Sequence, residues 1–195
     1  MNKKQTIIVI GILVLACCCV AALALAGFNY LGTSIGSTIE NADDPESVAR
    51  IASSIADYDV PAGYEQKAFE MLSIKYVFMT PANGGAPLIM LMQFPPNIAR
   101  NQEEMQKEME RAMARQSGQV STAMKVVDEK TYTIREQEVR ATIMEGETEV
   151  EGGTIVTRQM IVVFQGKTGV AALMFLGSKD GWDQEKIDSF VESLR

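Results

Sequence analysis

A long uncharged segment near the start of the chain constrains its structure most. Neither an acidic residue nor a Lys or Arg occurs from Ile7 to Phe28, where Ile, Val, Leu, Ala and Cys dominate. About 20 consecutive apolar residues span a bilayer as a helix, and only a helix satisfies the backbone of a single segment in lipid. The sequence therefore predicts that residues 1–28 form a cytoplasmic tip and a transmembrane anchor. The side chains assigned to the anchor are Ile7, Ile10, Leu13, Leu15, Val20, Leu23 and Leu25.

Charges on either side of this segment predict its orientation. Lys3 and Lys4 precede it, whereas no Lys or Arg follows it until Arg50, although acidic residues do. Because Lys and Arg collect on the cytoplasmic side of membrane helices, we expect a single-pass protein of the plasma or inner membrane. Its N-terminus is predicted to be cytoplasmic and its C-terminal domain extracytoplasmic.

Two kinds of processing compete with an uncleaved anchor. The residues from Ala24 to Ala26 have the small-x-small pattern of a signal-peptidase site, and Val14 to Cys17 resembles a lipoprotein box. The apolar stretch exceeds the usual 7–15 residues of a cleaved signal, and apolar rather than polar residues follow Cys17. Both observations favour an uncleaved, unlipidated anchor.

The cysteines and histidines limit the chemistry of the rest of the chain. The three cysteines, Cys17, Cys18 and Cys19, all lie in the apolar segment, and the chain has no histidine. We therefore predict no cofactor, no His or Cys metal site and no thiol nucleophile in the domain. Adjacent helical residues point about 100° apart, so the cysteine triplet is interpreted as small apolar residues. A stripe of Cys18, Ala22 and Ala26 leaves open the alternative of a self-associating envelope sensor or structural subunit.

Charge indicates which partners the domain accepts. All 25 acidic residues follow residue 28, together with all but two of the 18 Lys and Arg residues. An acidic surface is repelled by phosphate backbones and by anionic lipid headgroups. We therefore expect no nucleic-acid partner. The predicted partners are the lipid bilayer, through the anchor, and an envelope protein.

Local signals predict an α+β domain after a tether. Residues 29–44 are rich in Gly, Ser and acids and read as a flexible linker, and residues 45–195 read as the extracytoplasmic domain with a leading helix over 45–56. Further helices are expected over 97–117 and 183–194. Strands are expected over 64–71, 73–80, 88–94, 122–129, 131–144, 148–165 and 169–177, with turns at glycines that include Gly146. Consecutive strands with short turns predict a mostly antiparallel sheet with packed helices.

Catalytic motifs are weak. The sequence from Gln165 to Thr168 imitates the end of a P-loop, but Ile161 replaces the first glycine and a strand-like run follows, so a hairpin turn is favoured. There is no Gly-x-Ser-x-Gly motif, and no histidine can serve as a base. We predict no catalytic residues. A hydrolase that uses carboxylates or a Ser–Lys pair remains the alternative.

Two further patterns could bind a partner. Glu145, Glu147, Glu149 and Glu151 alternate, so on a strand they share one face and form a possible acidic contact face for Ca²⁺ or a basic partner. A solvated hairpin edge is favoured for them, because charges there resist aggregation. The methionines of the domain could bind Cu(I) through their thioethers or pack in an ordinary core, and we favour core packing.

The order of elements from about Asp59 to Arg195 resembles the PsbP-like fold. The resemblance rests on the turn from Val60 to Tyr64, the helix led by Pro95 and Pro96, the late hairpin with Gly169 to Phe175, and the closing helix after Trp182. PsbP-like proteins are mostly accessory, assembly or binding subunits without universal catalytic residues. The resemblance implies a non-enzymatic, membrane-anchored extracytoplasmic accessory or binding module.

Overall fold

The computed structural model describes residues 42–99, 101–115, 124–150 and 153–195. The predicted anchor and all of the predicted linker except residues 42–44 lie outside these residues. Within the described ranges, no helix is both long enough and apolar enough to cross a bilayer.

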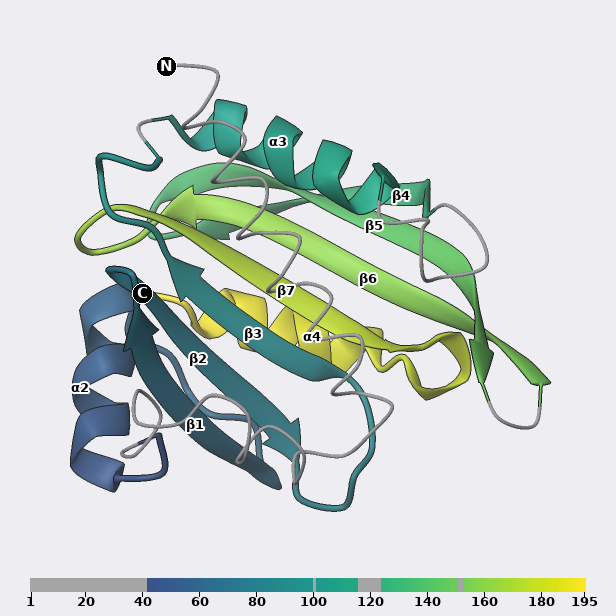
Figure 1. Ribbon diagram of the computed structural model, residues 1–195, viewed down its shortest axis with the longest axis horizontal. Helices are drawn as coiled ribbons and strands as arrows, with labels where there is room; N and C mark the ends of the chain where they lie inside the picture. The colour runs from purple at the N-terminus through teal and green to yellow at the C-terminus, as the bar shows by residue number, and fades with distance from the viewer. Residues whose placement is uncertain (1–41, 100, 116–123, 151–152) are drawn as a thin grey trace.

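Seven strands form one antiparallel sheet in the order β1-β2-β3-β7-β6-β5-β4 (Figure 1). Their bounds are β1 Tyr64–Met71, β2 Ile74–Pro81, β3 Leu88–Gln93, β4 Lys125–Ile134, β5 Gln137–Val150, β6 Gly153–Gln165 and β7 Val170–Ser178. The chain leaves β3 for the far edge of the sheet at β4 and then returns strand by strand to β7, which pairs with β3. The predicted α+β class and the antiparallel sheet are confirmed.

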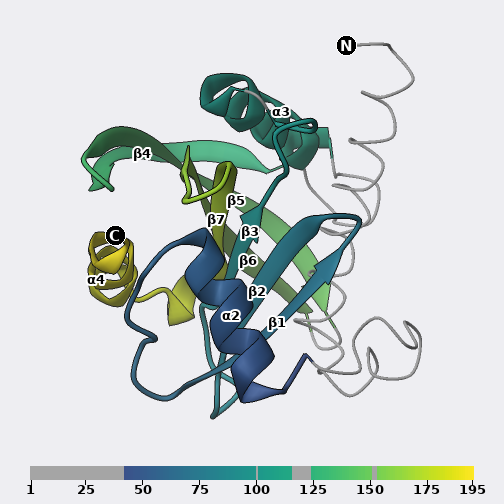
Figure 2. The ribbon, with the colours of Figure 1, turned by 90° about the vertical axis from the view of Figure 1, so that its left-hand side faces the viewer.

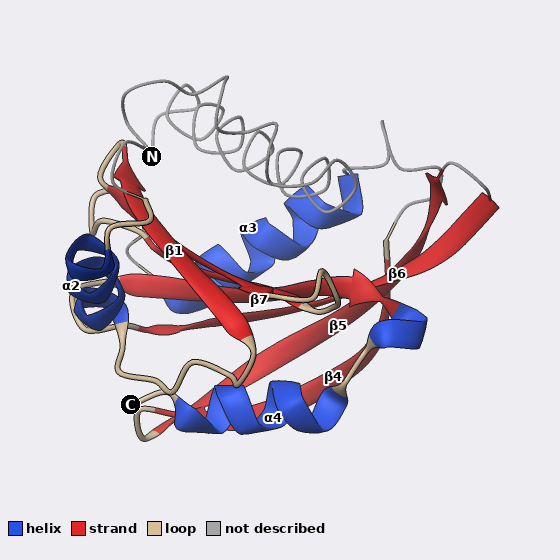
Figure 3. Cartoon of the chain, turned by 90° about the horizontal axis from the view of Figure 1, so that it is seen from below, coloured by secondary structure: helices blue, strands red, loops and turns tan. Residues whose placement is uncertain are grey.

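Helices cover both faces of the sheet. Helices α2 (Pro45–Ile55) and α4 (Gln184–Ser193) pack on one face, here called the two-helix face. Helix α3 (Gln102–Arg115) packs on the opposite face, here called the α3 face (Figures 2 and 3). A short 3₁₀ turn, η2 (Lys179–Gly181), links β7 to α4. The predicted leading helix and closing helix are confirmed.

Side-chain caps explain where the helices begin. Asp44 accepts a hydrogen bond from the Ser47 amide at 2.9 Å, and Asp183 accepts one from the Lys186 amide at 3.0 Å. The Asn101 side chain accepts from the Glu103 amide at 2.8 Å. Such caps satisfy amides that have no partner inside the helix. The predicted start of the middle helix at residue 97 is therefore wrong, since the chain forms a turn after Pro95 and α3 begins only after the Asn101 cap.

The two-helix face carries the larger core. Buried side chains from all seven strands meet Ile55 of α2 and Val191 of α4, which are both 0% exposed. The Phe175 and Phe190 rings meet edge to face with centroids 6.0 Å apart. Burying such side chains stabilises a fold by about 1.5–3 kcal/mol each, so α2 and α4 are integral parts of the domain.

Two predicted turns in and near the β4–β5 hairpin are wrong. The chain was expected to turn at Lys130, but β4 continues through Lys130 and the turn lies at Arg135 and Glu136. A turn was also expected at Gly146, which lies inside β5. A Cβ at residue 146 would lie 2.5 Å from the Met124 Sδ atom, so a larger residue there would have to displace the flexible Met124 side chain.

Candidate functional site

The predicted acidic row lies where the β5–β6 hairpin extends beyond its neighbours. Pairing of β4 with β5 reaches Glu145, and pairing of β7 with β6 reaches Thr157. Residues 146–150 and 153–156 therefore form a two-stranded extension (Figure 1), here called the hairpin extension. By strand alternation Glu145, Glu147 and Glu149 share one face of it, whereas Glu151 lies outside the described residues.

Glu145 is tied into the domain. Its carboxylate accepts hydrogen bonds from Arg158 Nε at 2.8 Å, from Arg158 Nη2, and from Lys179 Nζ at 3.1 Å. The side chain is 15% exposed, and the hydrogen bond from Arg158 lowers the pKa of Glu145 below its ordinary value. The Arg158 guanidinium also lies over the Trp182 ring, 5.7 Å from its centroid. Glu145 thus joins β5, β6 and η2 and is not a free contact residue.

The remaining part of the hairpin extension presents both charge and apolar surface. Glu147 and Glu149 are exposed and pair across the hairpin with Val156 and Thr154. Ile155 and Val156 are 37% and 36% exposed, and Val156 shares the face of the two glutamates. Acidic side chains beside exposed β-branched residues can contact a basic and apolar partner surface.

A Ser–Lys pair, which sequence reasoning could not locate, occurs at the C-terminal end of α2. Lys75 Nζ of β2 donates a hydrogen bond to Ser54 Oγ at 2.8 Å, and Ser54 Oγ donates to the Ile51 carbonyl at 2.6 Å. No basic residue lies in the last turn of α2 itself. Cations stabilise the negative end of a helix, so this ammonium group has a structural role even without catalysis.

The P-loop imitation is a hairpin turn that supports the same helix end. The Gly166 amide donates to the Gly169 carbonyl at 2.8 Å, and strand β7 follows at Val170. The Lys167 amide donates to the Ile55 carbonyl at 2.8 Å, and Lys167 Nζ bonds Asp57 Oδ1 at 2.6 Å. The predicted hairpin turn is confirmed.

A second polar cluster fastens α4 to the edge strand β4. Asp188 accepts hydrogen bonds from Tyr132 Oη at 2.5 Å, Gln184 Nε2 at 2.7 Å and Lys130 Nζ at 3.1 Å. Burial alone would raise the pKa of Asp188, but these hydrogen bonds outweigh it and lower the pKa below its ordinary value. The pKa of Tyr132 is raised, mainly by burial and also by the hydrogen bond to Asp188. The carboxylate is thus held ionised as an anchor for three donors.

These clusters are held by residues far apart in the chain. Ser54 and Lys75 are separated by 21 positions, and Tyr132 and Asp188 by 56. No spacing rule links such pairs before the strand register is known. Within the described residues, no three His, Cys, Asp or Glu side chains converge as a metal site would require.

Comparisons with known proteins include a likeness to a solved structure. No protein-family model and no curated protein matches the chain. The fold is similar to the crystal structure of LpqN, involved in cell envelope biogenesis of Mycobacterium tuberculosis, with 13% sequence identity and a TM-score of 0.42. The similarity covers 71% of this chain and 81% of that one.

Proposed function

We propose that this protein is a membrane-tethered accessory or binding module whose domain stands outside the cytoplasmic membrane and binds an envelope protein without catalysis. The main support for this proposal is the uncharged segment from Ile7 to Phe28, which has Lys3 and Lys4 on one side and an acidic domain on the other. A segment of this length and composition inserts into lipid, and the flanking lysines stay in the cytoplasm.

The hairpin extension is the proposed contact surface for the envelope partner. Glu147 and Glu149 supply negative charge, and Val156 supplies apolar area on the same face, whereas Ile155 lies on the opposite face. A two-stranded extension reaches past the helices of the domain (Figure 3), so a partner could approach it from either side. Charge complementarity then favours a basic partner surface.

Protease protection in bacterial cells that express the full chain tests the tether and the orientation. Protease added outside cells with a permeabilised outer membrane should digest the domain, and mass spectrometry should find Met1 or Asn2 still present on the membrane-bound fragment. A domain that resists protease until the inner membrane is opened would reverse the orientation. A mature chain that begins after Ala26 would replace the anchor with a cleaved signal.

The second candidate function is a hydrolase, which the Ser54–Lys75 pair favours. The 2.8 Å separation places an amine within proton-transfer reach of a hydroxyl. A fluorophosphonate probe should then label the wild-type chain and the Ser53→Ala variant but not Ser54→Ala. Ser53 is the matched control, because it is the exposed neighbour of Ser54 on the same helix. Equal labelling of all three proteins, or none, removes this candidate.

A further inference from the structure

Half of the α3 face is a continuous row of aromatic and methionine side chains. Across β1, β2 and β3, Phe69 pairs with Tyr76, Tyr76 with Met92, and Phe78 with Met90, so these side chains project from one face. The Phe69 ring stacks with Tyr76 at 5.1 Å and with Phe78 at 5.7 Å between centroids. This surface, here called the aromatic–methionine face, consists of Phe69, Met71, Tyr76, Phe78, Met90 and Met92.

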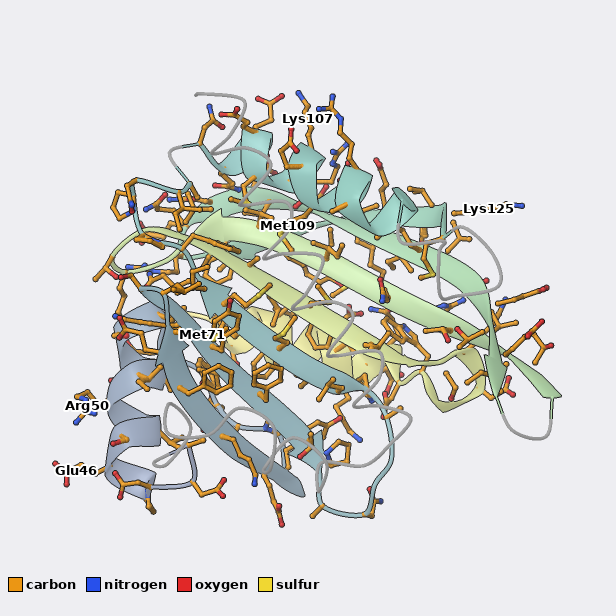
Figure 4. All side chains as sticks on the ribbon, in the orientation of Figure 1. Glu46, Arg50, Met71, Lys107, Met109 and Lys125 are labelled. Carbon is orange, nitrogen blue, oxygen red and sulfur yellow. The ribbon has the colours of Figure 1, made fainter. Side chains whose placement is uncertain are left out.

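The described helices do not lie over this face. Helix α3 packs on β6, while α2 packs against β1 and β2 from the two-helix face (Figure 2). Figure 4 shows the same separation, with Met109 beneath α3 and Met71 on β1 away from it. Yet Tyr76, Met90 and Met92 are only 3%, 1% and 2% exposed. Met105 and Met109 of α3 belong to the same buried cluster, but α3 packs chiefly on β6, so the part of the face on β1 and β2 needs a further cover.

The chain that precedes the domain reaches this part of the sheet. The Ala42 carbonyl accepts a hydrogen bond from the Ala68 amide of edge strand β1 at 3.1 Å, and Asp43 forms an ion pair with Lys67 at 2.8 Å. The described chain therefore begins beside β1. Of the stretches outside the described residues, only residues 1–41 are long enough to cover three strands.

We propose that the apolar segment 7–28 occupies the aromatic–methionine face of its own domain when no bilayer is present, and leaves that face open when it enters a membrane. This inference rests on the membrane tether of the proposed function. As a helix the segment would be about 33 Å long, and strand β2 spans about 26 Å, so the segment is long enough to lie along the whole strand. Methionine side chains adapt to an irregular apolar partner. The segment is removed from water both on the aromatic–methionine face and in a bilayer.

The native cysteines make this proposal directly testable in the full chain. Cys17, Cys18 and Cys19 are the only cysteines, and they lie in the middle of the segment. Single cysteines are introduced as Met71→Cys and Leu88→Cys. Met71 belongs to the face and Leu88 packs beside it, and both native side chains are half-buried. Glu136→Cys, at the exposed β4–β5 turn, is the matched control.

Crosslinking with a flexible bismaleimide in lipid-free buffer should join the segment to position 71 or 88 within one chain and leave the Glu136→Cys control at least tenfold less crosslinked. Neutral phosphatidylcholine vesicles should abolish the intrachain product. Only interchain products would assign the face to a second copy and overturn the proposal, as would equal crosslinking of the control or none at any position. Circular dichroism of each variant confirms that it is folded before crosslinking.

Vesicle flotation separates this proposal from the proposed function. If the chain crosslinks in buffer but does not float with vesicles and keeps its crosslink when they are added, the segment occupies the face. The membrane tether of the proposed function is then wrong. A chain that floats but never crosslinks retains the tether, and the face then belongs to another occupant.

Discussion

At the scale of single residues, the two ends of the acidic row have different surroundings. Glu145 bonds Arg158 and Lys179 at the base of the hairpin extension, whereas Glu149 is exposed farther along the same strand. Stability and partner binding are therefore separable along one strand face. Substitution at Glu145 acts on the fold, and substitution at Glu149 acts on the surface that we propose for a partner.

We predict that Glu145→Gln flattens the acid side of the pH–stability profile. The hydrogen bond from Arg158 lowers the pKa of Glu145 from its ordinary value of 4.5. A lowered folded-state pKa stabilises the domain above the ordinary pKa, and this stabilisation is lost as the pH falls through the folded-state pKa. Urea unfolding from pH 6 to pH 2 measures it, with Glu149→Gln as the control that keeps the wild-type slope. Equal slopes for wild type and Glu145→Gln would contradict the prediction.

We also predict that Gly169→Ala destabilises the domain by about 1–3 kcal/mol, as overpacking in a core does. An added Cβ at residue 169 would lie 2.6 Å from the Phe94 carbonyl oxygen, which is fixed in the backbone. Gly146→Ala is the comparison, because the nearest atom there is the movable Met124 Sδ. Urea unfolding should show the larger loss for Gly169→Ala. The reverse order would show that the backbone at Phe94 yields more readily than the Met124 side chain.

At the scale of elements, caps fix the helix boundaries more firmly than the apolar pattern does. Asp183 caps α4 through the Lys186 amide, so Asp183→Ala should lower the free energy of unfolding by about 0.5–2 kcal/mol. Asp183→Asn should retain most of the stability, since an amide oxygen caps a helix as well as a carboxylate does. Thermal or urea unfolding of both variants checks this. Equal losses would assign the effect to the charge instead of the cap.

The sequence predicted most elements but misplaced the β4–β5 turn, which lacks glycine. The first hairpin turns at Leu72 and Ser73, and the β4–β5 hairpin at Arg135 and Glu136, all with φ between 50° and 64°. This left-handed geometry normally favours Gly, Asn or Asp, so the β4–β5 turn carries no residue signal. The first hairpin was located correctly, whereas β4 is an exposed edge strand whose apolar pattern is weak.

The candidate site was less predictable than the fold for a physical reason. Alternation placed the glutamates on one strand face, but the partners of Glu145 depend on the register that sets Arg158 opposite it. The Ser54–Lys75 contact depends on how α2 lies across β2. Such contacts are set by packing between elements, and short-range patterns do not carry that information.

At the scale of the whole molecule, we propose two alternative positions for one apolar segment, as a membrane anchor and as a cover for the domain. The acidic domain gains nothing from an anionic membrane surface, so in this proposal the segment alone determines attachment. The charges that flank the segment would then set its orientation. Lys3 and Lys4 carry that information, because the next basic residue is Arg50.

We predict that replacing both Lys3 and Lys4 by Glu inverts a large fraction of the chains, so that the domain of those chains becomes cytoplasmic. The change removes both basic residues next to the segment while leaving its apolar length intact, so insertion persists and the bias that sets its direction is lost. Protease accessibility of the domain in cells with a permeabilised outer membrane should fall several-fold. The Lys125→Glu variant alters an exposed lysine of the domain and should leave accessibility unchanged. Unchanged accessibility in the double variant would mean that the folded domain, and not the flanking charge, sets the topology.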